Sequence, residues 1–500
     1  MNNVKSSFIL LIALLFGLQS FAQFNLSGKI SHYTGKESLK VNIPMVYGFH
    51  RENSISIPIT KDGHFSISLP ISQAKFANLI YQRQFYTLLL HPAKNLVIEL
   101  NEADTVLKLL GGTALPVNKL MQQVDLEEYP FFMANNYGTD KFSLQQLNEQ
   151  VLQPYYAQRD SKIKKVMNTS IPENDKLLIA SELKYIAYNY LNDLARGLLT
   201  NKPTIDSLIM VIFDQNDPKP EVFPAGPQYY GFAANYLRYL ETKAFIEIKK
   251  NQIKPSEPIP YFGISLDSAN VVVKKYGKPY WRLIGATRNL LPKVTEQLTY
   301  QEISNLFDDK DLRLVEALTN AFTSRFPNSP YNAAIRKKAT TLRALLAKNE
   351  QNKAIEIVEG FEKINSIYDV IRPLKGKVVY VDVWGTWCGP CKEELYFLPG
   401  LKARFANKDV AYIYLDLDDD DMDLSWREFI KVNNLTGLHL RKTRQNIAPF
   451  WKELLANTDD KAEYYPQYFI FDKDGKLVVS KANRPSSKEL LYAQIEEVLK

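Results

Sequence analysis

The chain contains two cysteines, Cys388 and Cys391, which are separated by the dipeptide Gly389-Pro390. A disulfide across so short a loop removes little conformational entropy from the unfolded chain and therefore stabilises a fold only slightly. Neither residue has another cysteine with which it could form a structural bridge. The pair is therefore expected either to undergo thiol-disulfide exchange with another molecule or to bind a metal ion.

The residues around the pair predict a strand followed by a helix. Val378–Trp384 is a nearly continuous apolar run, as expected for a strand buried on both faces. Pro390 suits the first turn of a helix, because an N–H at that position would lack a helical acceptor anyway. Cys388 would then lie at a helix N-terminus, where unpaired backbone N–H groups and the helix dipole stabilise a thiolate.

These positions predict a defined exchange reaction. A thiolate at Cys388 would attack a partner disulfide and form a mixed disulfide. Cys391 falls on the same face of the starting helix, so it would attack the Cys388 sulfur and release the partner in reduced form. We therefore expect disulfide-bearing protein substrates, a separate redox protein as electron donor, and no cofactor beyond the Cys388–Cys391 disulfide.

A family resemblance supports this chemistry. Residues 381–392, with the sequence VDVWGTWCGPCK, closely resemble the thioredoxin active-site segment. A later insertion at residues 446–456 and an Asp-Lys-Asp-Gly hairpin at residues 472–475 resemble the TlpA/ResA-like branch of that superfamily. The resemblance implies an α/β thioredoxin-like domain over residues 351–500. It also implies a thiol-disulfide oxidoreductase, and the Gly-Pro spacer resembles that of reducing members.

The resemblance implies roles for individual residues. Cys388 resembles the attacking thiol and Cys391 the resolving thiol, while Trp384 and Trp387 match the flanking tryptophans. Asp382 matches a buried carboxylate that accepts a proton during resolution. Burial at a strand end would raise the pKa of that carboxyl group and suit it to proton transfer near neutral pH. The simpler alternative for Asp382 is a structural hydrogen bond to a strand terminus.

A second segment of the site is implied at Tyr465-Pro466. This dipeptide precedes a predicted strand, at the place where the superfamily has a cis-proline facing the cysteines. Pro466, with Tyr465, is therefore expected to dock an extended partner peptide, although a proline can also simply begin a strand. The chain departs from the family at Tyr396, where relatives have a proline, and its own Pro399 lies further along. This departure leaves open whether the active-site helix is kinked.

The rest of the chain predicts two further domains. Residues 23–112 alternate apolar and polar positions, with an Asp62-Gly63 hairpin signal between residues 54–59 and 64–69, which predicts an antiparallel β domain. This region weakly resembles a β-rich domain of unknown function that precedes thioredoxin-like domains in exported bacterial proteins. Residues 113–350 have apolar positions at helical spacing and predict an α-helical domain.

An aromatic cluster in the helical region has two interpretations. It could form a groove for a partner, but aromatic side chains at helical spacing more often belong to a core. The cluster consists of Tyr229, Tyr230, Phe232, Tyr236 and Tyr239.

The first residues predict a signal peptide. Lys5 is followed by an apolar run over residues 8–18 and by Ser20-Phe21-Ala22, which predicts cleavage after Ala22. The run is shorter than the roughly 18 apolar residues that span a bilayer. Residue 23 is glutamine, so the lipid-modified cysteine of a lipoprotein is absent. We expect export to the periplasm of a Gram-negative bacterium as a soluble protein.

Composition and motifs argue against several other functions. The chain has 62 basic and 55 acidic residues without a dense basic block, which argues against nucleic-acid binding. A zinc site would need further ligands beside the cysteines, and His439 is the only histidine of the C-terminal domain. The aspartates from 416 to 423 lack the glycine and glutamate of a calcium-binding EF-hand, and the residues before Cys388 lack a peroxidase pattern. No metal is expected.

A different class of function remains as the alternative hypothesis. The β and helical regions would capture a partner, and the thioredoxin-like domain would be auxiliary. The intact Cys-Gly-Pro-Cys run favours the enzyme over this scaffold protein.

Overall fold

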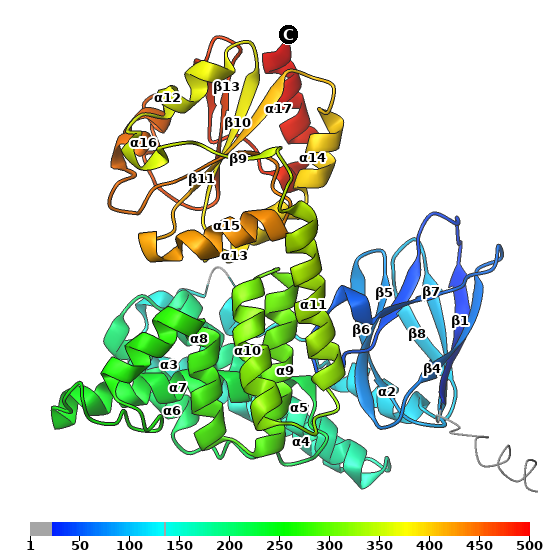
Figure 1. The fold of residues 1–500 in the computed structure, drawn as a ribbon. Coiled ribbons are helices and arrows are strands. Elements are labelled where there is room, and N and C mark those ends of the chain that lie inside the picture. Colours follow the sequence, from blue (N-terminus) through cyan, green and yellow to red (C-terminus); the bar gives the residue numbers. More distant parts are fainter. Residues whose placement is uncertain (1–22, 135–136) are drawn as a thin grey trace, which may run out of the picture. The chain divides into compact units, whose positions relative to one another are not determined.

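The computed structural model describes residues 23–134 and 137–500. The predicted signal peptide at residues 1–22 lies outside the described residues. The chain divides into two compact units, residues 1–301 and residues 302–500 (Figure 1). This division lies at neither of the limits predicted from the sequence, after residues 112 and 350, and the three-domain division stays a prediction.

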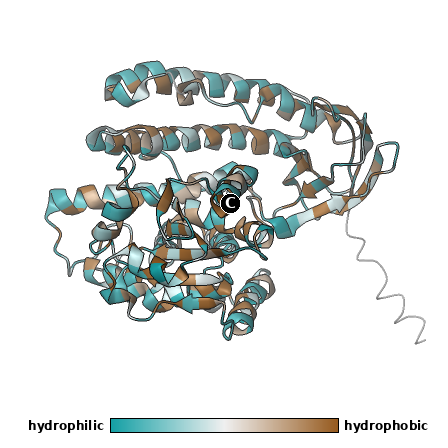
Figure 2. Ribbon diagram, turned by 90° about the horizontal axis from the view of Figure 1, so that it is seen from above, coloured by the Kyte–Doolittle hydropathy of each residue, from teal (hydrophilic) through white to brown (hydrophobic). Residues whose placement is uncertain are grey.

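The long helices are amphipathic, and hydrophobic and hydrophilic residues follow one another along their ribbons (Figure 2). Each such helix can therefore bury one face in a core and expose the other. Over residues 23–134 and 137–500, none of the helices combines the length and the apolar character needed to cross a bilayer.

Eight strands in the first unit form two four-stranded sheets. The strands are β1 Gln23–Ser31, β2 Leu39–Asn42, β3 Ser54–Ile57, β4 His64–Pro70, β5 Lys75–Tyr81, β6 Gln84–Leu90, β7 Asn95–Asn101 and β8 Leu107–Gly111. The sheet orders are β4-β1-β7-β8 and β3-β2-β5-β6. A core of alternating apolar residues from both sheets, including Leu26, Leu79 and Ile98, is fully buried.

One strand pairing corrects the predicted antiparallel β domain. Strand β1 runs parallel to β7, with Asn25 beside Asn95 and Ser31 beside Asn101. The other pairings described for these two sheets are antiparallel. The prediction was wrong for this pair because alternation of apolar residues shows which face of a strand is buried, but not the direction of its neighbour.

The Asp62-Gly63 turn is present but does not join a hairpin of two named strands. Gly63 has a φ of 87°, and its N–H donates to the Thr60 carbonyl oxygen at 2.9 Å. A Cβ on Gly63 would lie 2.3 Å from the Ile30 carbonyl oxygen, so only glycine fits. Strands β3 and β4, on either side of the turn, lie in different sheets. Ile59 and Phe65 form an antiparallel bridge across the turn, so the predicted hairpin is confirmed at this pair, and beyond it the two strands join different sheets.

The remainder of the first unit is helical. Its helices are α2 Leu115–Val124, α3 Leu144–Leu147, α4 Gln153–Met167, α5 Glu173–Asp193, α6 Lys202–Phe213, α7 Pro227–Asn251, α8 Leu266–Asn289 and α9 Pro292–Asp308, the last of which contains the unit boundary. Within the aromatic cluster on α7, Tyr229, Tyr230, Phe232 and Tyr239 are buried and Tyr236 is partly buried. These side chains belong to the helical core, which favours the core interpretation of the cluster.

The second unit is built on a six-stranded sheet with helices on both faces (Figure 1). Its strands are β9 Ile355–Ile357, β10 Val378–Trp384, β11 Val410–Asp416, β12 Gly437–Arg441, β13 Gln467–Phe471 and β14 Leu477–Ser480. Its helices are α10 Leu312–Arg325, α11 Asn332–Asn349, α12 Ile367–Ile371, α13 Gly389–Leu395, α14 Leu398–Arg404, α15 Asp423–Val432, α16 Ala448–Leu454 and α17 Glu489–Leu499.

The sheet order β14-β13-β10-β11-β12-β9 places β10 in the centre. Strand β10 is buried along its whole length, as its continuous apolar run predicts. Strands β10, β11, β12 and β9 are parallel, and β13 and β14 are antiparallel to them. The carboxyl ends of β10, β11 and β12 therefore meet at one edge of the sheet, where the two cysteines follow β10.

Helices α10 and α11 belong to the second unit, although their sequence was assigned to the central helical domain. Helix α11 packs along α15, and the Asn349 side chain donates to the Lys431 carbonyl oxygen at 2.9 Å. Lys431 also forms an ion pair with Glu350. Apolar spacing predicted the helix over residues 312–349 but cannot show which neighbour it packs against.

We expect a fragment of residues 351–500 to be less stable than one of residues 309–500. Removing α10 and α11 exposes the face of α15 that α11 covers, and it deletes the contacts of Asn349 and Glu350. At roughly 1 kcal/mol for each lost hydrogen bond or packed apolar group, the loss should reach about 2 kcal/mol. Urea unfolding followed by circular dichroism measures it, and equal midpoints for the two fragments would contradict the assignment.

Candidate active site

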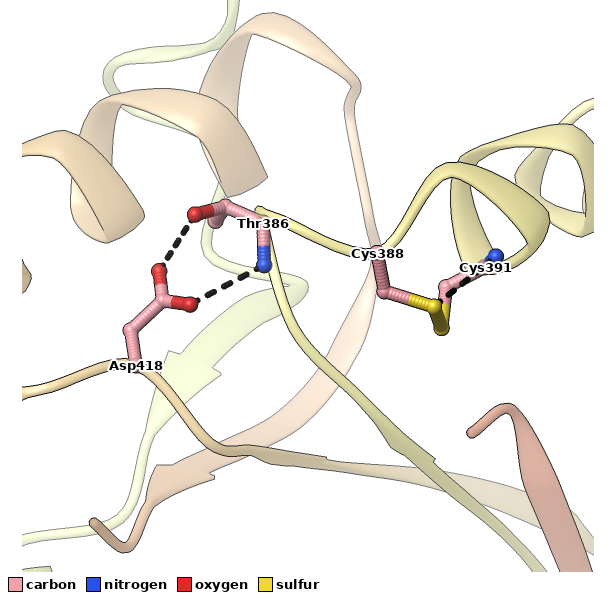
Figure 3. The surroundings of a disulfide bond; sticks show 4 residues. All are labelled: Thr386, Cys388, Cys391 and Asp418. Carbon is pink, nitrogen blue, oxygen red and sulfur yellow. Dashed lines mark hydrogen bonds between the residues drawn. A yellow bond between two sulfur atoms is a disulfide. The ribbon is translucent and has the colours of Figure 1, made fainter. Parts of the chain in front are cut away.

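Cys388 and Cys391 are joined by a disulfide, with their Cα atoms 5.2 Å apart (Figure 3). Cys388 is the N-cap residue of α13, and its Sγ accepts a hydrogen bond from the Cys391 N–H at 3.2 Å. Pro390 lies in the first turn of this helix. Both cysteines are buried, with 4% and 2% of their surface exposed. The structure therefore places Cys388 Sγ where an anion would be stabilised by a helix N-terminus.

The loop that precedes α13 is tightly turned. The Cys388 N–H donates to the Gly385 carbonyl oxygen at 3.0 Å. A Cβ on Gly385 would lie 2.6 Å from Trp387 Nε1, so the indole packs directly on this glycine. Gly389, also expected to support the site, has open space around the position of a Cβ. The structure thus gives a steric reason for glycine at 385 and none at 389.

The two tryptophans beside the disulfide have different environments. Trp384 is fully buried and packs against Phe429 of α15, with ring centroids 5.5 Å apart. Trp387 is 46% exposed and meets the Tyr465 ring edge-on at 5.5 Å. The Arg444 guanidinium lies 4.3 Å from the centre of the Trp387 ring. Trp384 therefore belongs to the core, and Trp387 forms a surface beside Cys388.

The segment Tyr465-Pro466 borders this surface. The Tyr465–Pro466 peptide bond is cis, as the family resemblance implied. Pro466 leads directly into β13, which pairs with β10, so Gln467 lies opposite Val383. The predicted docking segment and the cysteine segment are thus brought together by neighbouring strands, with Tyr465 in contact with Trp387.

Asp382 lies in the middle of β10 and is 2% exposed. Burial raises the pKa of its carboxyl group well above the ordinary value, the negative charge of Glu394 raises it further, and Lys402 opposes this shift. Among the described residues, its Oδ1 has no hydrogen-bond partner. A carboxyl group held in this way can carry a proton near neutral pH.

Two charged residues near Asp382 were not identified from the sequence. Glu394 of α13 is buried and accepts hydrogen bonds from both the N–H and the hydroxyl of Ser486, each at 2.8 Å. Lys402 of α14 donates to Thr436 Oγ1 at 2.9 Å, and burial lowers its pKa to about 7. Only the packing of α13 and α14 beside β10 brings these groups to Asp382.

The comparisons with known proteins agree with this geometry. The Redoxin family model matches residues 358–498. The thiol-disulfide oxidoreductase ResA of Bacillus thuringiensis subsp. konkukian is 30% identical over 156 residues, which make up 31% of this chain and 77% of that protein. The C-terminal part of the chain belongs to the ResA-like branch of the thioredoxin superfamily. The chain is accordingly a thioredoxin-like thiol-disulfide oxidoreductase.

Two further relatives have similar coverage. ResA of Bacillus cereus is 29% identical over 154 residues, or 31% of this chain and 78% of that protein. A protein from Bacteroides vulgatus whose solution structure is assigned as a thiol-disulfide oxidoreductase is 30% identical, with a TM-score of 0.22. The matched region makes up 26% of this chain and 78% of the Bacteroides vulgatus chain. The family assignment concerns the thioredoxin-like segment alone.

The ResA-like domain divides its active-site helix without the usual family proline. Helix α13 ends at Leu395, and α14 begins at Leu398 with Pro399 in its first turn. Tyr396, at the position where relatives carry proline, is 60% exposed and lies between the two helices. The active-site helix is therefore interrupted between Leu395 and Leu398, and Pro399 lies in the first turn after the interruption.

In this ResA-like domain, changes at Glu394 and Lys402 are expected to shift the pKa of Asp382 in opposite directions. Glu394→Gln removes a like charge and should lower that pKa, whereas Lys402→Met removes an opposing charge and should raise it. The ¹³C chemical shift of the Asp382 carboxyl group, followed by NMR against pH, measures both. Lys408→Met, on the exposed end before β11, serves as the control and should leave the titration unchanged. Shifts of the same sign in both variants would contradict the assignment.

Proposed function

We propose that this chain reduces disulfides of partner proteins through a Cys388–Cys391 dithiol. The observation that carries the proposal is the position of Cys388 Sγ at the N-cap of α13, where it accepts the Cys391 N–H. In the reduced protein the same N–H would face a Cys388 thiolate and stabilise it. Cys388 would then be the nucleophile, and Cys391 would remain protonated until it is needed.

The reaction proceeds by two exchanges. The Cys388 thiolate attacks one sulfur of the partner disulfide, a bond forms between the two sulfurs, and the other partner sulfur leaves as a thiolate. Cys391 then loses its proton, attacks the Cys388 sulfur and releases the second partner sulfur. The partner has gained two electrons and, with two protons from solvent and the site, leaves as a dithiol. The chain is left as the Cys388–Cys391 disulfide.

Asp382 is the proposed acceptor of the Cys391 proton. Its carboxyl group is buried in the strand that leads to the cysteines, and its raised pKa makes the ionised form a stronger base. Glu394 and Lys402 adjust this basicity in opposite senses. In this proposal the second exchange, and not the first, depends on Asp382.

Partner docking is proposed on Pro466, Tyr465 and Trp387. Tyr465 and the half-exposed Trp387 are in contact, and Trp387 packs on Gly385 and directly precedes Cys388 in the sequence. An extended partner segment on this surface would lie beside the attacking sulfur. The oxidised chain would be returned to the dithiol by a separate protein that donates electrons through its own dithiol.

Export is part of the proposal. The basic start, apolar run and Ser20-Phe21-Ala22 of the first residues are those of a cleaved signal peptide. The proposed location is the periplasm of a Gram-negative bacterium. Fractionation of cells that express the tagged full-length chain tests this directly, since retention in the cytoplasm would contradict it.

The direction of the reaction is tested by the reduction potential. Equilibration of the full chain with glutathione buffers is expected to give a value near the about −270 mV of thioredoxin, and the reduced chain should reduce insulin. A value near about −120 mV, with faster oxidation of dithiol peptides than reduction of disulfides, would show an oxidant instead. A Cys391→Ala variant should capture partners as mixed disulfides through Cys388 and identify them by mass spectrometry.

A further inference from the structure

Asp418 binds the active-site loop with both of its carboxylate oxygens. The Thr386 N–H donates to Asp418 Oδ1 at 3.1 Å, and the Thr386 hydroxyl donates to Oδ2 at 2.5 Å (Figure 3). Asp418 is 1% exposed, so water does not compete for these oxygens. Two hydrogen bonds to one residue fix both the position and the orientation of Thr386.

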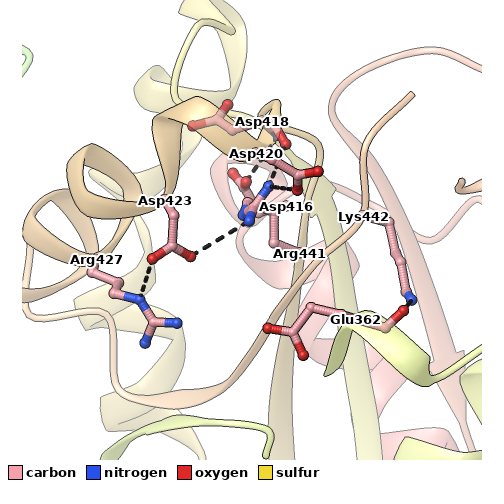
Figure 4. A network of polar contacts seen from close by, with 8 residues as sticks. All are labelled: Glu362, Asp416, Asp418, Asp420, Asp423, Arg427, Arg441 and Lys442. Carbon is pink, nitrogen blue, oxygen red and sulfur yellow. Dashed lines mark hydrogen bonds and ion pairs between the residues drawn. The ribbon is translucent and has the colours of Figure 1, made fainter. Parts of the chain in front are cut away.

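The backbone of Asp418 is hydrogen-bonded to the last residues of β11 and β12. Its N–H donates to Asp416 Oδ1 at 2.9 Å, and its carbonyl oxygen accepts from Arg441 Nη1 at 3.1 Å. Arg441 also donates to Asp420 Oδ1 at 2.9 Å and contacts Asp423 Oδ1 at 3.5 Å (Figure 4). Arg441 is 5% exposed and ends β12, and Asp416 ends β11, so the network joins the ends of two neighbouring strands.

The arrangement has a high electrostatic cost. Burial and the negative charge of Asp418 raise the pKa of Asp416. Burial also raises the pKa of Asp418, and the hydrogen bonds from Thr386 and the charge of Arg441 oppose this shift. A buried carboxylate needs such partners to be stable. The hydrogen bonds from Thr386 and the charge of Arg441 therefore both stabilise the Asp418 carboxylate.

Thr386 belongs to the loop that carries Cys388. It lies between Gly385, whose carbonyl oxygen accepts the Cys388 N–H, and Trp387, which precedes Cys388. On the other side Cys388 is fixed by α13, where its Sγ meets the Cys391 N–H. Movement of Thr386 would therefore shift Cys388 Sγ relative to the N–H that stabilises it.

We propose that Asp418 is a positioning residue of the redox centre, which holds Thr386 so that Cys388 Sγ stays at the helix N-terminus. This inference rests on the proposed function, in which a Cys388 thiolate is the nucleophile. Asp418 touches neither substrate nor sulfur, and acts through Thr386 alone. Near the loop, Lys392 pairs with Asp309, Glu394 accepts from Ser486, and the Arg444 guanidinium lies over the Trp387 ring. Three further charged residues, Asp311, Arg313 and Glu428, line a pocket with Thr386.

The direction in which Asp418→Ala changes the pKa of the Cys388 thiol distinguishes a positioning role of Asp418 from a purely electrostatic one. If Asp418 acted only through its negative charge, Asp418→Ala would favour the thiolate and lower the pKa of the Cys388 thiol. If it acts by positioning, the same change should raise that pKa and make the disulfide harder to reduce. Thr386→Val removes one hydrogen bond without removing a charge, and Thr386→Ser restores the hydroxyl.

The test is the rate of Cys388 alkylation by iodoacetamide against pH, with the reduction potential, in the reduced full chain. At pH 6, Thr386→Val is expected to react about fivefold more slowly than the wild type, the factor for one lost hydrogen bond, and Asp418→Ala about tenfold or more. Both potentials should become more negative. Thr386→Ser should match the wild type. Asp474→Ala is the control, because Asp474 is an exposed carboxylate in the turn between β13 and β14 and lies outside the Arg441 network.

Unchanged profiles and potentials in both Thr386→Val and Asp418→Ala would overturn the inference, as would a lowered Cys388 pKa in Asp418→Ala. If Asp418→Ala fails to fold, as judged by circular dichroism, the Thr386→Val and Thr386→Ser pair decides alone. A wild-type Cys388 that reacts like an ordinary thiol would refute the proposed function itself, which is a separate outcome from loss of the difference between variants.

Discussion

Cys388→Ser is expected to abolish disulfide reduction by the full chain, whereas Cys391→Ser should retain the first exchange and lose turnover. The Cys388 sulfur alone lies at the N-cap of α13 and receives a backbone N–H. Without it there is no stabilised nucleophile, and insulin reduction should fall by at least about 10³-fold, in the range of losses seen when a catalytic nucleophile is removed.

The two serine variants should differ in the product that accumulates. With a model disulfide peptide, Cys391→Ser should form a stable mixed disulfide at Cys388, because no second sulfur is present to release the peptide. Mass spectrometry after a short incubation measures this adduct. An adduct on Cys391 in the Cys388→Ser protein, formed as fast as that on Cys388, would reverse the assigned roles.

Asp382→Asn is expected to slow the second exchange by about 10²-fold and to leave the first unchanged. An amide cannot accept the Cys391 proton, and a positioned general base is typically worth about 10² to 10⁴ in rate. Rapid-mixing experiments with the peptide disulfide separate formation of the mixed disulfide from its decay. Equal slowing of both steps would mean that Asp382 acts on the structure of the site and not on the proton of Cys391.

The same variant should change how stability depends on pH. In the folded chain the pKa of Asp382 lies well above its ordinary value. Above about pH 4 the folded state therefore holds a proton that the unfolded state has lost. Stability of the wild type should therefore fall as pH rises towards the folded pKa, by up to about 1.4 kcal/mol per pH unit. Asp382→Asn removes this term and should gain stability over the wild type as the pH rises above about 4, the ordinary pKa of an aspartate.

Urea unfolding of both proteins at several pH values, followed by tryptophan fluorescence, measures this difference. Lys402 has the opposite dependence, because its pKa is lowered to about 7 and its folded form loses a proton that the unfolded form retains. Because the charge of Asp382 raises the pKa of Lys402, the Lys402 contribution changes in Asp382→Asn, and measuring both proteins in a Lys402→Met background removes it from the comparison. A constant difference across the pH range would show that Asp382 is ionised normally in the folded chain.

The part of the site that could be predicted from the sequence is the part that is local. The buried strand β10, the helix start at Cys388 and the first-turn Pro390 lie in one continuous segment, and each residue type has a direct structural consequence there. Asp382 lies in the same apolar strand, but its role as a proton acceptor was implied by resemblance to the family. The cis Tyr465–Pro466 segment was implied only by resemblance to a family.

The residues that could not be predicted are those whose neighbours are distant in the sequence. Nothing around Lys402 or Glu394 indicates that α13 and α14 place them beside Asp382. Thr386 and Asp418 look like an ordinary loop residue and one member of an acidic run until β10 and β11 lie side by side. The parallel pairing of β1 with β7 and the packing of α11 on α15 depend on neighbours in the same way.

The most direct test of this account is the pH dependence of Cys388 alkylation in the fully reduced chain, with each cysteine quantified by mass spectrometry. A sulfur at the N-terminus of α13 should titrate below the about 8.5 of an ordinary cysteine and stay reactive below pH 7, while Cys391 should not. A Cys388 profile centred near 8.5, or equal reactivity of the two cysteines, would contradict the proposed mechanism.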